Sequence, residues 1–142
     1  MFLDTRGQGF DGRKWYAYMA AESILYIRLE MYVQNTNDDV SAPFSTQVKA
    51  AFTTHAPQAV VIDARQNPGG DNAYLEELFT FLATSTPAGR LFHFIDEGSM
   101  SAAMLGAAQL KMLLNSWEKN KKTATSDKKS NVAILYFQII IF

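Results

Sequence analysis

The fold of this chain is decided around the stretch Val60-Val61-Ile62-Asp63-Ala64-Arg65-Gln66-Asn67-Pro68-Gly69-Gly70, where an apolar run leads into a turn. A short, continuous apolar strand over 59–63 is typical of a parallel sheet, in which both faces of a strand are covered. Asn, Pro and Gly are the residues that turns require, so we expect the chain to reverse at 67–70. Asp71 or Asn72 would then cap the next helix. The stretch predicts a strand, a turn and a helix.

Strands and helices are expected to alternate on both sides of this stretch. Apolar periodicity and turn residues predict strands at 14–19, 24–33 and 91–95, and helices at 43–54, from 71 or 72 to about 86, and at 102–114. The first two strands should form a hairpin that buries one face, made of Leu25, Ile27, Leu29, Met31 and Val33. This order predicts an α/β fold class with a mostly parallel sheet.

The two ends of the chain differ in character from its middle. We expect an N-terminal extension over 1–14, a core over 15–116, and a lysine-rich linker with an apolar strand over 117–142. The apolar run at 132–142 is shorter than the roughly 20 residues that a membrane span needs. It therefore predicts one last strand of the sheet, with the altered end of a longer protein as the alternative.

Composition limits the classes of function. The chain has 142 residues, of which 48% are hydrophobic, so one domain with a sizeable core is expected. Its formal net charge of -1 gives no basic footprint for a nucleic acid partner. The absence of cysteine excludes disulfides, thiolate metal sites and a cysteine nucleophile, but leaves localisation open. No spacing of His, Asp and Glu predicts a metal site, and no cofactor is expected.

A second stretch, Gly98-Ser99-Met100-Ser101-Ala102-Ala103, places a serine at the start of a predicted helix. A carbonyl under attack develops negative charge on its oxygen, and N–H groups of a Gly-Gly turn can approach it closely because no Cβ intervenes. Gly69 and Gly70 suit that role, and the Ala102 N–H at the helix N-terminus would add a further donor. Ser101 would be the nucleophile. The alternative interpretation is a plain turn followed by an N-cap serine.

The residues at 61–70 and 98–104 closely resemble the two signature segments of the tail-specific, C-terminal-processing serine peptidases and their tricorn-type relatives. The order of residues from Trp15 to about Lys111 also follows that family, over roughly two thirds of the chain. The resemblance implies a crotonase-like fold, shared with the caseinolytic (Clp) protease, built of repeated ββα units. It implies that Ser101 is the nucleophile, with Gly69 and Ala102 as the oxyanion donors. The chain would then be truncated after the helix that carries the serine.

The general base is the missing part of this pattern. Processing peptidases of the family take a lysine from beyond the serine, while tricorn-type members use a histidine and a glutamate. Lys121, Lys122, Lys128 and Lys129 lie in the corresponding region, but within a charged run where their amines should stay protonated. We therefore expect none of them to be a ready base.

Histidines and carboxylates offer no clear replacement. His93 lies inside a predicted strand, so packing against the sheet is expected, and His55 should end the first helix near the surface. Asp63 and the Asp96-Glu97 pair lie at strand ends, where bracing of loops is expected.

The sequence thus predicts a serine-type peptidase domain that acts on a peptide or an unfolded protein, with no membrane span. Three alternatives stay open: an inactive scaffold that binds peptides or pairs with itself as a homo-oligomer, a truncated fragment, and an acyl-CoA enzyme of the same superfold. Trp15, Tyr16 and Tyr18 are expected to pack in the core and hairpin, with a peptide-binding platform as the alternative.

Overall fold

Strands and helices alternate along the chain in the computed structural model, which describes residues 13–32, 44–71, 73–124 and 138–141. The elements in chain order are β1 (Lys14–Met19), β2 (Ile24–Leu29), α1 (Phe44–His55), β3 (Ala59–Asp63), the short 3₁₀ helix η1 (Ala73–Leu75), α2 (Glu76–Ser85), β4 (Leu91–Ile95), α3 (Ala102–Ala124) and β5 (Gln138–Ile141). The first unit is therefore ββα, and the next two each run from a strand to a helix.

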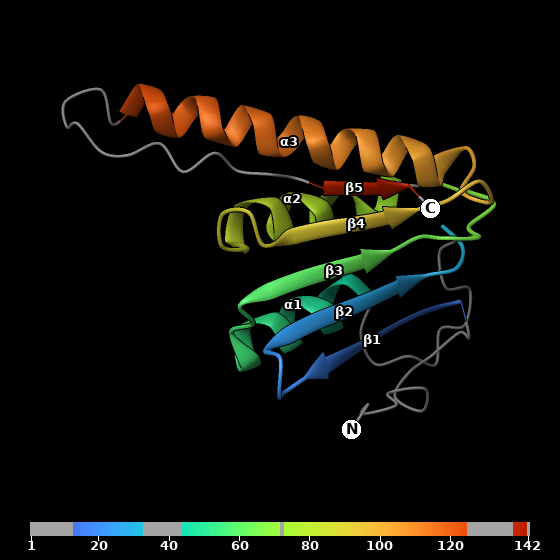
Figure 1. Ribbon diagram of the computed structural model, residues 1–142, viewed down its shortest axis with the longest axis horizontal. Helices are drawn as coiled ribbons and strands as arrows, with labels where there is room; N and C mark the ends of the chain where they lie inside the picture. Colours follow the sequence, from blue (N-terminus) through green and yellow to red (C-terminus); the bar gives the residue numbers. More distant parts are fainter. Residues whose placement is uncertain (1–12, 33–43, 72, 125–137, 142) are drawn as a thin grey trace.

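The described strands form one five-stranded sheet in the order β1-β2-β3-β4-β5 (Figure 1). The β1–β2 pair is an antiparallel hairpin, and every later pair in the sheet is parallel. In the two central pairs, Ile27 lies opposite Ile62 and Ile62 lies opposite His93. The predicted α/β class with a mostly parallel sheet is confirmed.

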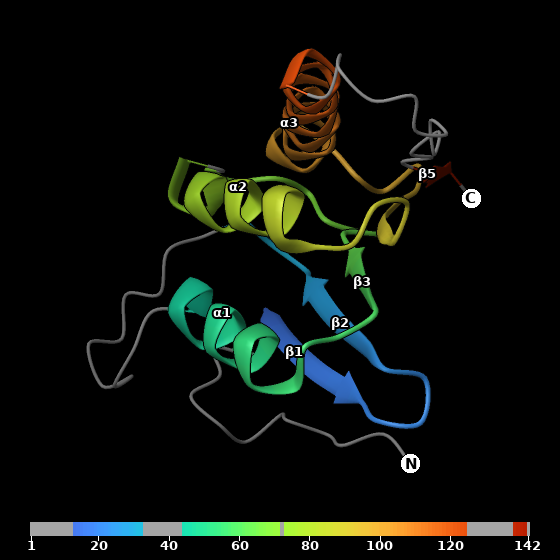
Figure 2. The same ribbon diagram turned by 90° about the vertical axis from the view of Figure 1, so that its left-hand side faces the viewer.

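The helices gather on one side of the sheet (Figure 2). Helices α1 and α2 cover the same face, and α3 packs against α2 and β4 beyond them. Along β2, Leu25, Ile27 and Leu29 are fully buried, whereas Tyr26 and Arg28 between them are half-buried on the opposite face. This alternation sets the register of the hairpin, because a slip by one residue would expose the apolar set.

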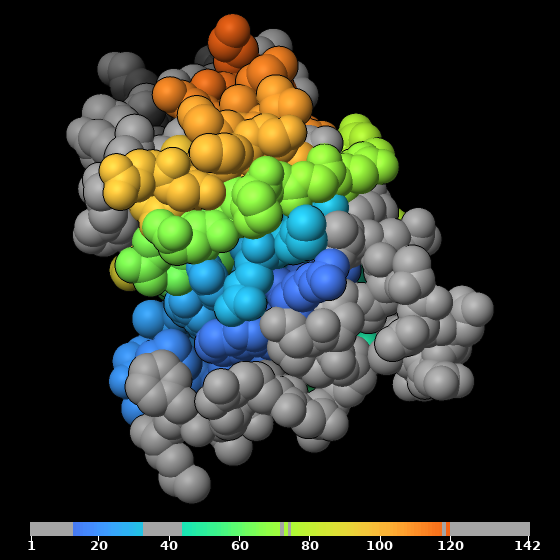
Figure 3. Space-filling view, turned by 90° about the vertical axis from the view of Figure 1, so that its right-hand side faces the viewer, coloured from blue at the N-terminus to red at the C-terminus, as the bar shows by residue number. Residues whose placement is uncertain are grey.

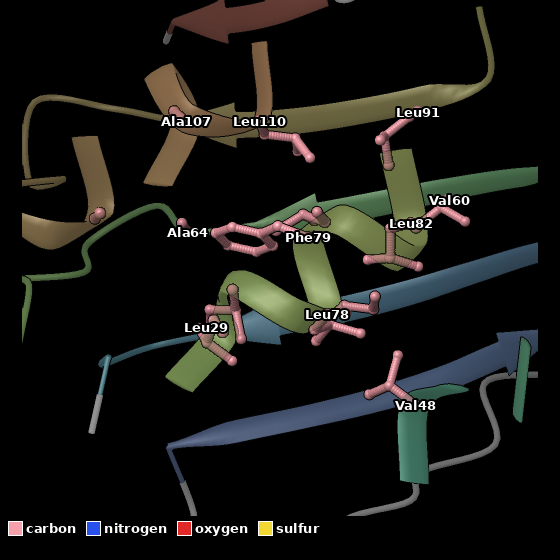
Figure 4. Close-up of a cluster of buried hydrophobic side chains, with 14 of the residues drawn as sticks. Leu29, Val48, Val60, Ala64, Leu78, Phe79, Leu82, Leu91, Ala107 and Leu110 are labelled. Atoms are coloured by element: carbon pink, nitrogen blue, oxygen red, sulfur yellow. The ribbon is translucent and has the colours of Figure 1, made fainter. Parts of the chain in front are cut away.

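The core lies between the helices and the sheet. Phe79, Leu78 and Leu82 of α2 meet Leu29 and Val60 of the strands, and all five side chains are fully buried (Figure 4). Helix α3 contributes small side chains and one leucine, Ala103, Ala107 and Leu110. Burying one such leucine stabilises the fold by roughly 1.5–3 kcal/mol.

Three strands follow the sequence closely, whereas the strand predicted at 24–33 ends at Leu29 and the third helix is longer than predicted. The strands at 14–19, 59–63 and 91–95 have the predicted bounds. The predicted helix at 102–114 is too short, because α3 continues through the lysine-rich residues to Ala124. Lysine, glutamate and alanine are good helix formers, so a charged run without apolar anchors still extends a helix that packing has already started.

The remaining predictions near the ends are met in part. Residues 138–141 form β5 beside β4, as expected for the apolar end, while 125–137 lie outside the described residues.

The cap predicted for the second helix lies on the short helix before it. Asp71 Oδ1 accepts the N–H of Ala73 at 2.9 Å, so it caps η1 rather than α2 itself. Asn72 and Val33 lie outside the described residues.

Candidate functional site

Two loops meet at the carboxyl edge of the sheet. Because β3 and β4 are parallel neighbours, the segments 64–71 and 96–101 leave the sheet at the same edge. This is the edge at which open α/β sheets bind ligands. Figure 3 faces this edge and shows the green segment of the glycine turn lying against the gold start of α3.

Hydrogen bonds tie the two loops together. The N–H of Met100 donates to the carbonyl oxygen of Asn67 at 2.9 Å. The buried Ser99 hydroxyl donates to the carbonyl oxygen of Ala64 at 2.8 Å. The residue directly before Ser101 is therefore bonded to the turn that carries the glycines.

Asp96 braces the same pair of loops, as predicted. Its Oδ1 accepts the backbone N–H of Gln66 at 2.8 Å and that of Gly98 at 3.0 Å, and its Oδ2 accepts Gln66 Nε2 at 2.6 Å. These hydrogen bonds, led by the one from the Gln66 N–H, lower the pKa of Asp96 below its usual range. Asp96 thus serves as a charged anchor between the loops.

Gly69 faces Ser101 directly. Its φ of +110° is in the left-handed region, and a Cβ added there would lie 2.7 Å from Ser101 Cβ and 3.2 Å from the N of Ala102. Only glycine fits such an approach. The structure therefore brings together Gly69, Ser101 and Ala102, three of the four site residues that the sequence predicted.

Gly70, the fourth, faces the sheet instead. Its φ is +129°, and a Cβ added there would lie 1.9 Å from the carbonyl oxygen of Tyr32. The N–H of Tyr32 donates to Gly69 O at 2.8 Å, and Asp71 N–H donates to Tyr32 O at 2.7 Å. Tyr32 thus holds the glycine turn as an additional rung beyond β2.

Sequence reasoning missed this role of Tyr32. The predicted alternation placed Met31 on the buried face, but β2 ends at Leu29, and Tyr32 is the fully buried residue while Met31 is partly exposed. The Tyr32 ring packs edge-on to Phe79, with 6.3 Å between ring centroids. A period-two pattern gives no signal for the point at which the strand ends.

Ser101 lies exposed at the N-terminus of α3 in an unusual conformation. Its φ is +49°, which is uncommon for a residue other than glycine and is often found at functional sites. The carbonyl oxygen of Ser101 accepts the N–H of Leu105 at 3.0 Å, so the helix begins directly after it. Within the described residues, no group hydrogen-bonds the Ser101 hydroxyl.

The three N–H groups predicted as oxyanion donors differ in their hydrogen bonding. The Gly69 N–H already donates to Asn67 Oδ1 at 2.8 Å. The N–H groups of Gly70 and Ala102 have no hydrogen-bond partner within the described part of the chain. The N-terminus of α3 adds a positive partial charge beside the Ala102 N–H. Of these two N–H groups, that of Ala102 directly follows Ser101, whereas Gly70 lies against Tyr32.

Neither histidine approaches Ser101 as a base. His93 is fully buried beside Phe79, its ring nitrogens make no hydrogen bond to a described residue, and burial lowers its pKa to about 4. His55 is exposed at the end of α1 and stacks on Tyr18 at 4.2 Å. Because α1 leads into the amino end of β3, His55 lies at the opposite edge of the sheet. Both placements confirm the sequence prediction.

The lysine candidates lie along or beyond α3. Lys121 and Lys122 belong to the same helix as Ala102, and a helix rises 1.5 Å per residue. Lys121 therefore lies about 30 Å along the helix from Ser101, far beyond the reach of a lysine side chain. Lys128 and Lys129 lie outside the described residues.

Asp63 anchors a cluster on the helix-free face of the sheet. This buried carboxylate accepts hydrogen bonds from the Tyr26 hydroxyl, Arg28 Nη1 at 3.0 Å and Arg65 Nη2 at 2.7 Å. Burial alone would raise the pKa of Asp63, but the hydrogen bonds from Arg65 and Tyr26 bring it below its usual value. Burial and Asp63 raise the pKa of Tyr26 to about 12. The cluster lines an open pocket of about 380 Å³, and Asp63 has the bracing role predicted for it.

Neither a metal site nor a membrane span is found in the described part of the chain. Its His, Asp and Glu side chains form no group of three or more that could hold an ion. Its helices are each too short or too polar to cross a bilayer.

No protein-family model and no curated protein matches the chain. Among solved structures, it is similar to one from Parabacteroides merdae described as a "putative peptidase", with a TM-score of 0.52 and 14% identity over 74% of this chain and 41% of that one. It is also similar to a photosystem II D1 C-terminal processing protease, with a TM-score of 0.43 and 19% identity over 63% of this chain and 28% of that one.

The first similarity shows a shared fold, that of a mixed α/β domain. The chain spans about two fifths of the length of that structure, since 41% of it is covered.

Proposed function

We propose that this chain is a serine-type peptidase domain that cleaves peptides or unfolded proteins. The observation that carries the proposal is the approach of Gly69 to Ser101, which leaves no room for a Cβ between the glycine turn and the serine. The positive φ of Ser101 and its exposed hydroxyl, which no described residue hydrogen-bonds, add support, because strained backbone is often kept at functional sites.

In the proposed reaction, Ser101 Oγ attacks the carbonyl carbon of a peptide bond. The hydroxyl proton passes to a base, and negative charge develops on the carbonyl oxygen, where N–H donors stabilise it. We assign the N–H groups of Gly70 and Ala102 as these donors, while the Gly69 N–H stays bonded to Asn67. Breakage of the C–N bond releases the amine with a proton, and water then hydrolyses the ester on Ser101.

The base remains the open part of this mechanism. Because α3 carries Lys121 and Lys122 away from Ser101, we propose that a base reaches the site from another chain, as in a homo-oligomer. The specific alternative is a peptide-binding scaffold without turnover. It is favoured by the absence of any histidine or lysine base beside Ser101 in the described residues.

A fluorophosphonate probe tests the proposal, because such probes react with a serine whose hydroxyl is activated. We would compare the full chain with Ser101→Ala and with Ser85→Ala, a matched control at an exposed serine that ends α2. We expect labelling of the chain and of Ser85→Ala, and none of Ser101→Ala.

Folded protein that takes up no probe at any pH between 6 and 9 would contradict the proposal. In that case, a peptide that binds without being hydrolysed would establish the scaffold. A labelling rate per molecule that rises with protein concentration would support a base supplied by a second copy.

A further inference from the structure

Asn67 is a fully buried residue at the meeting point of three segments. Its Nδ2 donates to the carbonyl oxygen of Leu29 at the end of β2, at 2.7 Å. Its Oδ1 accepts the N–H of Gly69 at 2.8 Å, and its own carbonyl oxygen accepts the N–H of Met100 at 2.9 Å. One residue therefore links the sheet, the glycine turn and the residue before Ser101.

Each bond fixes a different part of the site. The bond from the Gly69 N–H to a side chain two residues earlier is an Asx turn, which holds the chain in its reversed course at the glycines. The bond to Leu29 anchors this turn to a strand that packing already fixes. The bond from Met100 then sets where the helix of Ser101 begins. An amide is suited to the first two, because it donates and accepts at once.

We propose that Asn67 is a positioning residue, which sets the separation between the glycine turn and Ser101 and so the activity of the serine. The inference rests on the proposed function, because it concerns the same site. Asn67 acts through Gly69 and Met100, and it does not itself contact the attacked carbonyl.

Other contacts between the loops do not set the separation between the glycine turn and Ser101. The bonds from Ser99 to Ala64 and from Gln66 to Asp96 hold the two loops where they leave the strands. Tyr32 holds the carbonyl oxygen of Gly69, and Asn67 holds its N–H.

Three substitutions separate the bonds of the amide. Asn67→Asp keeps the acceptor for Gly69 but sets a carboxylate oxygen against the Leu29 carbonyl, which is repulsive. Asn67→Ser keeps a shorter acceptor without a donor that reaches Leu29. Asn67→Ala removes both bonds and leaves buried polar groups unpaired.

The test measures the rate at which fluorophosphonate labels Ser101 in the full chain, under conditions where each variant is folded. We expect labelling to slow by about 10- to 100-fold in Asn67→Asp and Asn67→Ala, and by less in Asn67→Ser, since a displacement of about 1 Å can cost 10²-fold. Two controls are included. Glu77→Ala removes an exposed ion pair with Lys49, away from both loops, and Val48→Ala destabilises the core at a buried residue of α1. Both should label within twofold of the unaltered chain.

Equal labelling of Asn67→Asp and the unaltered chain would overturn the inference, as would equal slowing in either control. A readout independent of activity keeps the two proposals apart. Amide hydrogen exchange at Gly69 and Met100 should accelerate in the Asn67 variants and stay unchanged in Val48→Ala. If the unaltered chain takes up no probe, the proposed function fails, and exchange alone decides the role of Asn67. Unchanged amide exchange at Gly69 and Met100 in Asn67→Asp would refute the positioning role of Asn67.

Discussion

Individual residues at the carboxyl edge hold unusual backbone angles. Positive φ occurs at Gln66, Gly69, Gly70 and Ser101, all within the two bonded loops. For residues other than glycine, such angles cost of order 1–3 kcal/mol and persist only where the surroundings enforce them. Here the two loops are held by the hydrogen bonds of Asp96 to Gln66, of Tyr32 to the glycine turn, and of Asn67 to Gly69 and Met100.

Gly70 provides a residue-scale test of this tight packing. Gly70→Ala would place a Cβ 1.9 Å from the Tyr32 carbonyl oxygen, so the rung between Tyr32 and the turn must open. We expect a loss of about 2–4 kcal/mol in the free energy of unfolding, measured by urea titration. Gly89→Ala is the matched control: its φ is +71°, but an added Cβ meets nothing within 4 Å, so a loss of about 1 kcal/mol is expected. Equal losses of unfolding free energy in Gly70→Ala and Gly89→Ala would show that backbone strain alone, and not the contact with Tyr32, determines the effect.

At the scale of elements, α3 has one buried face and one exposed apolar face. Leu110 is fully buried against the core, whereas Met112, two residues on, is 69% exposed. We expect Leu110→Ala to lower the free energy of unfolding by roughly 2–5 kcal/mol, through lost burial and a residual cavity. Met112→Ala should change it by less than about 0.5 kcal/mol. Chemical denaturation of both variants checks the difference, and a large effect of Met112→Ala would mean that this face is covered in solution.

Elements were predictable where local pattern and packing agree. Apolar runs bounded by turn residues located β1, β3 and β4, because such runs have one way to be buried. The length of α3 was not predictable from apolar spacing, since its last turns depend on helix propensity alone. Tyr32 and Asn67 escaped prediction because their partners, Gly69 and Leu29, become neighbours only after the sheet has formed.

The juxtaposition of Gly69 with Ser101 followed from topology. Parallel neighbouring strands bring their carboxyl ends to one edge, so two loops that follow such strands must meet. Their chemistry is a different matter. A base is defined by its position in space, and neither spacing nor composition located one. The roles assigned to Ser101, Gly70 and Ala102 therefore stay predictions until the serine is tested.

At the scale of the whole molecule, the two faces of the sheet differ in the charge and hydrogen bonding of the ionisable group that each buries. Asp63 on the helix-free face is charged and saturated with hydrogen bonds from Arg28, Arg65 and Tyr26. His93 on the helix face has no hydrogen bond from the described part of the chain to either ring nitrogen, and it is neutral because burial lowers its pKa. Folding thus favours the charged form of Asp63 and the uncharged form of His93.

This difference sets the pH dependence of stability. Because the pKa of His93 falls from 6.5 to about 4 on folding, the unfolded chain binds the extra proton. The contribution of neutral His93 is complete above pH 6.5 and is lost as the pH falls from 6.5 toward 4, by roughly 3 kcal/mol in all. Asp63, whose pKa is lowered on folding, loses its contribution at still lower pH. Urea titrations between pH 7 and pH 4.5 should therefore show a falling free energy of unfolding that His93→Leu largely removes. A slope unchanged in His93→Leu would assign the pH dependence to other groups.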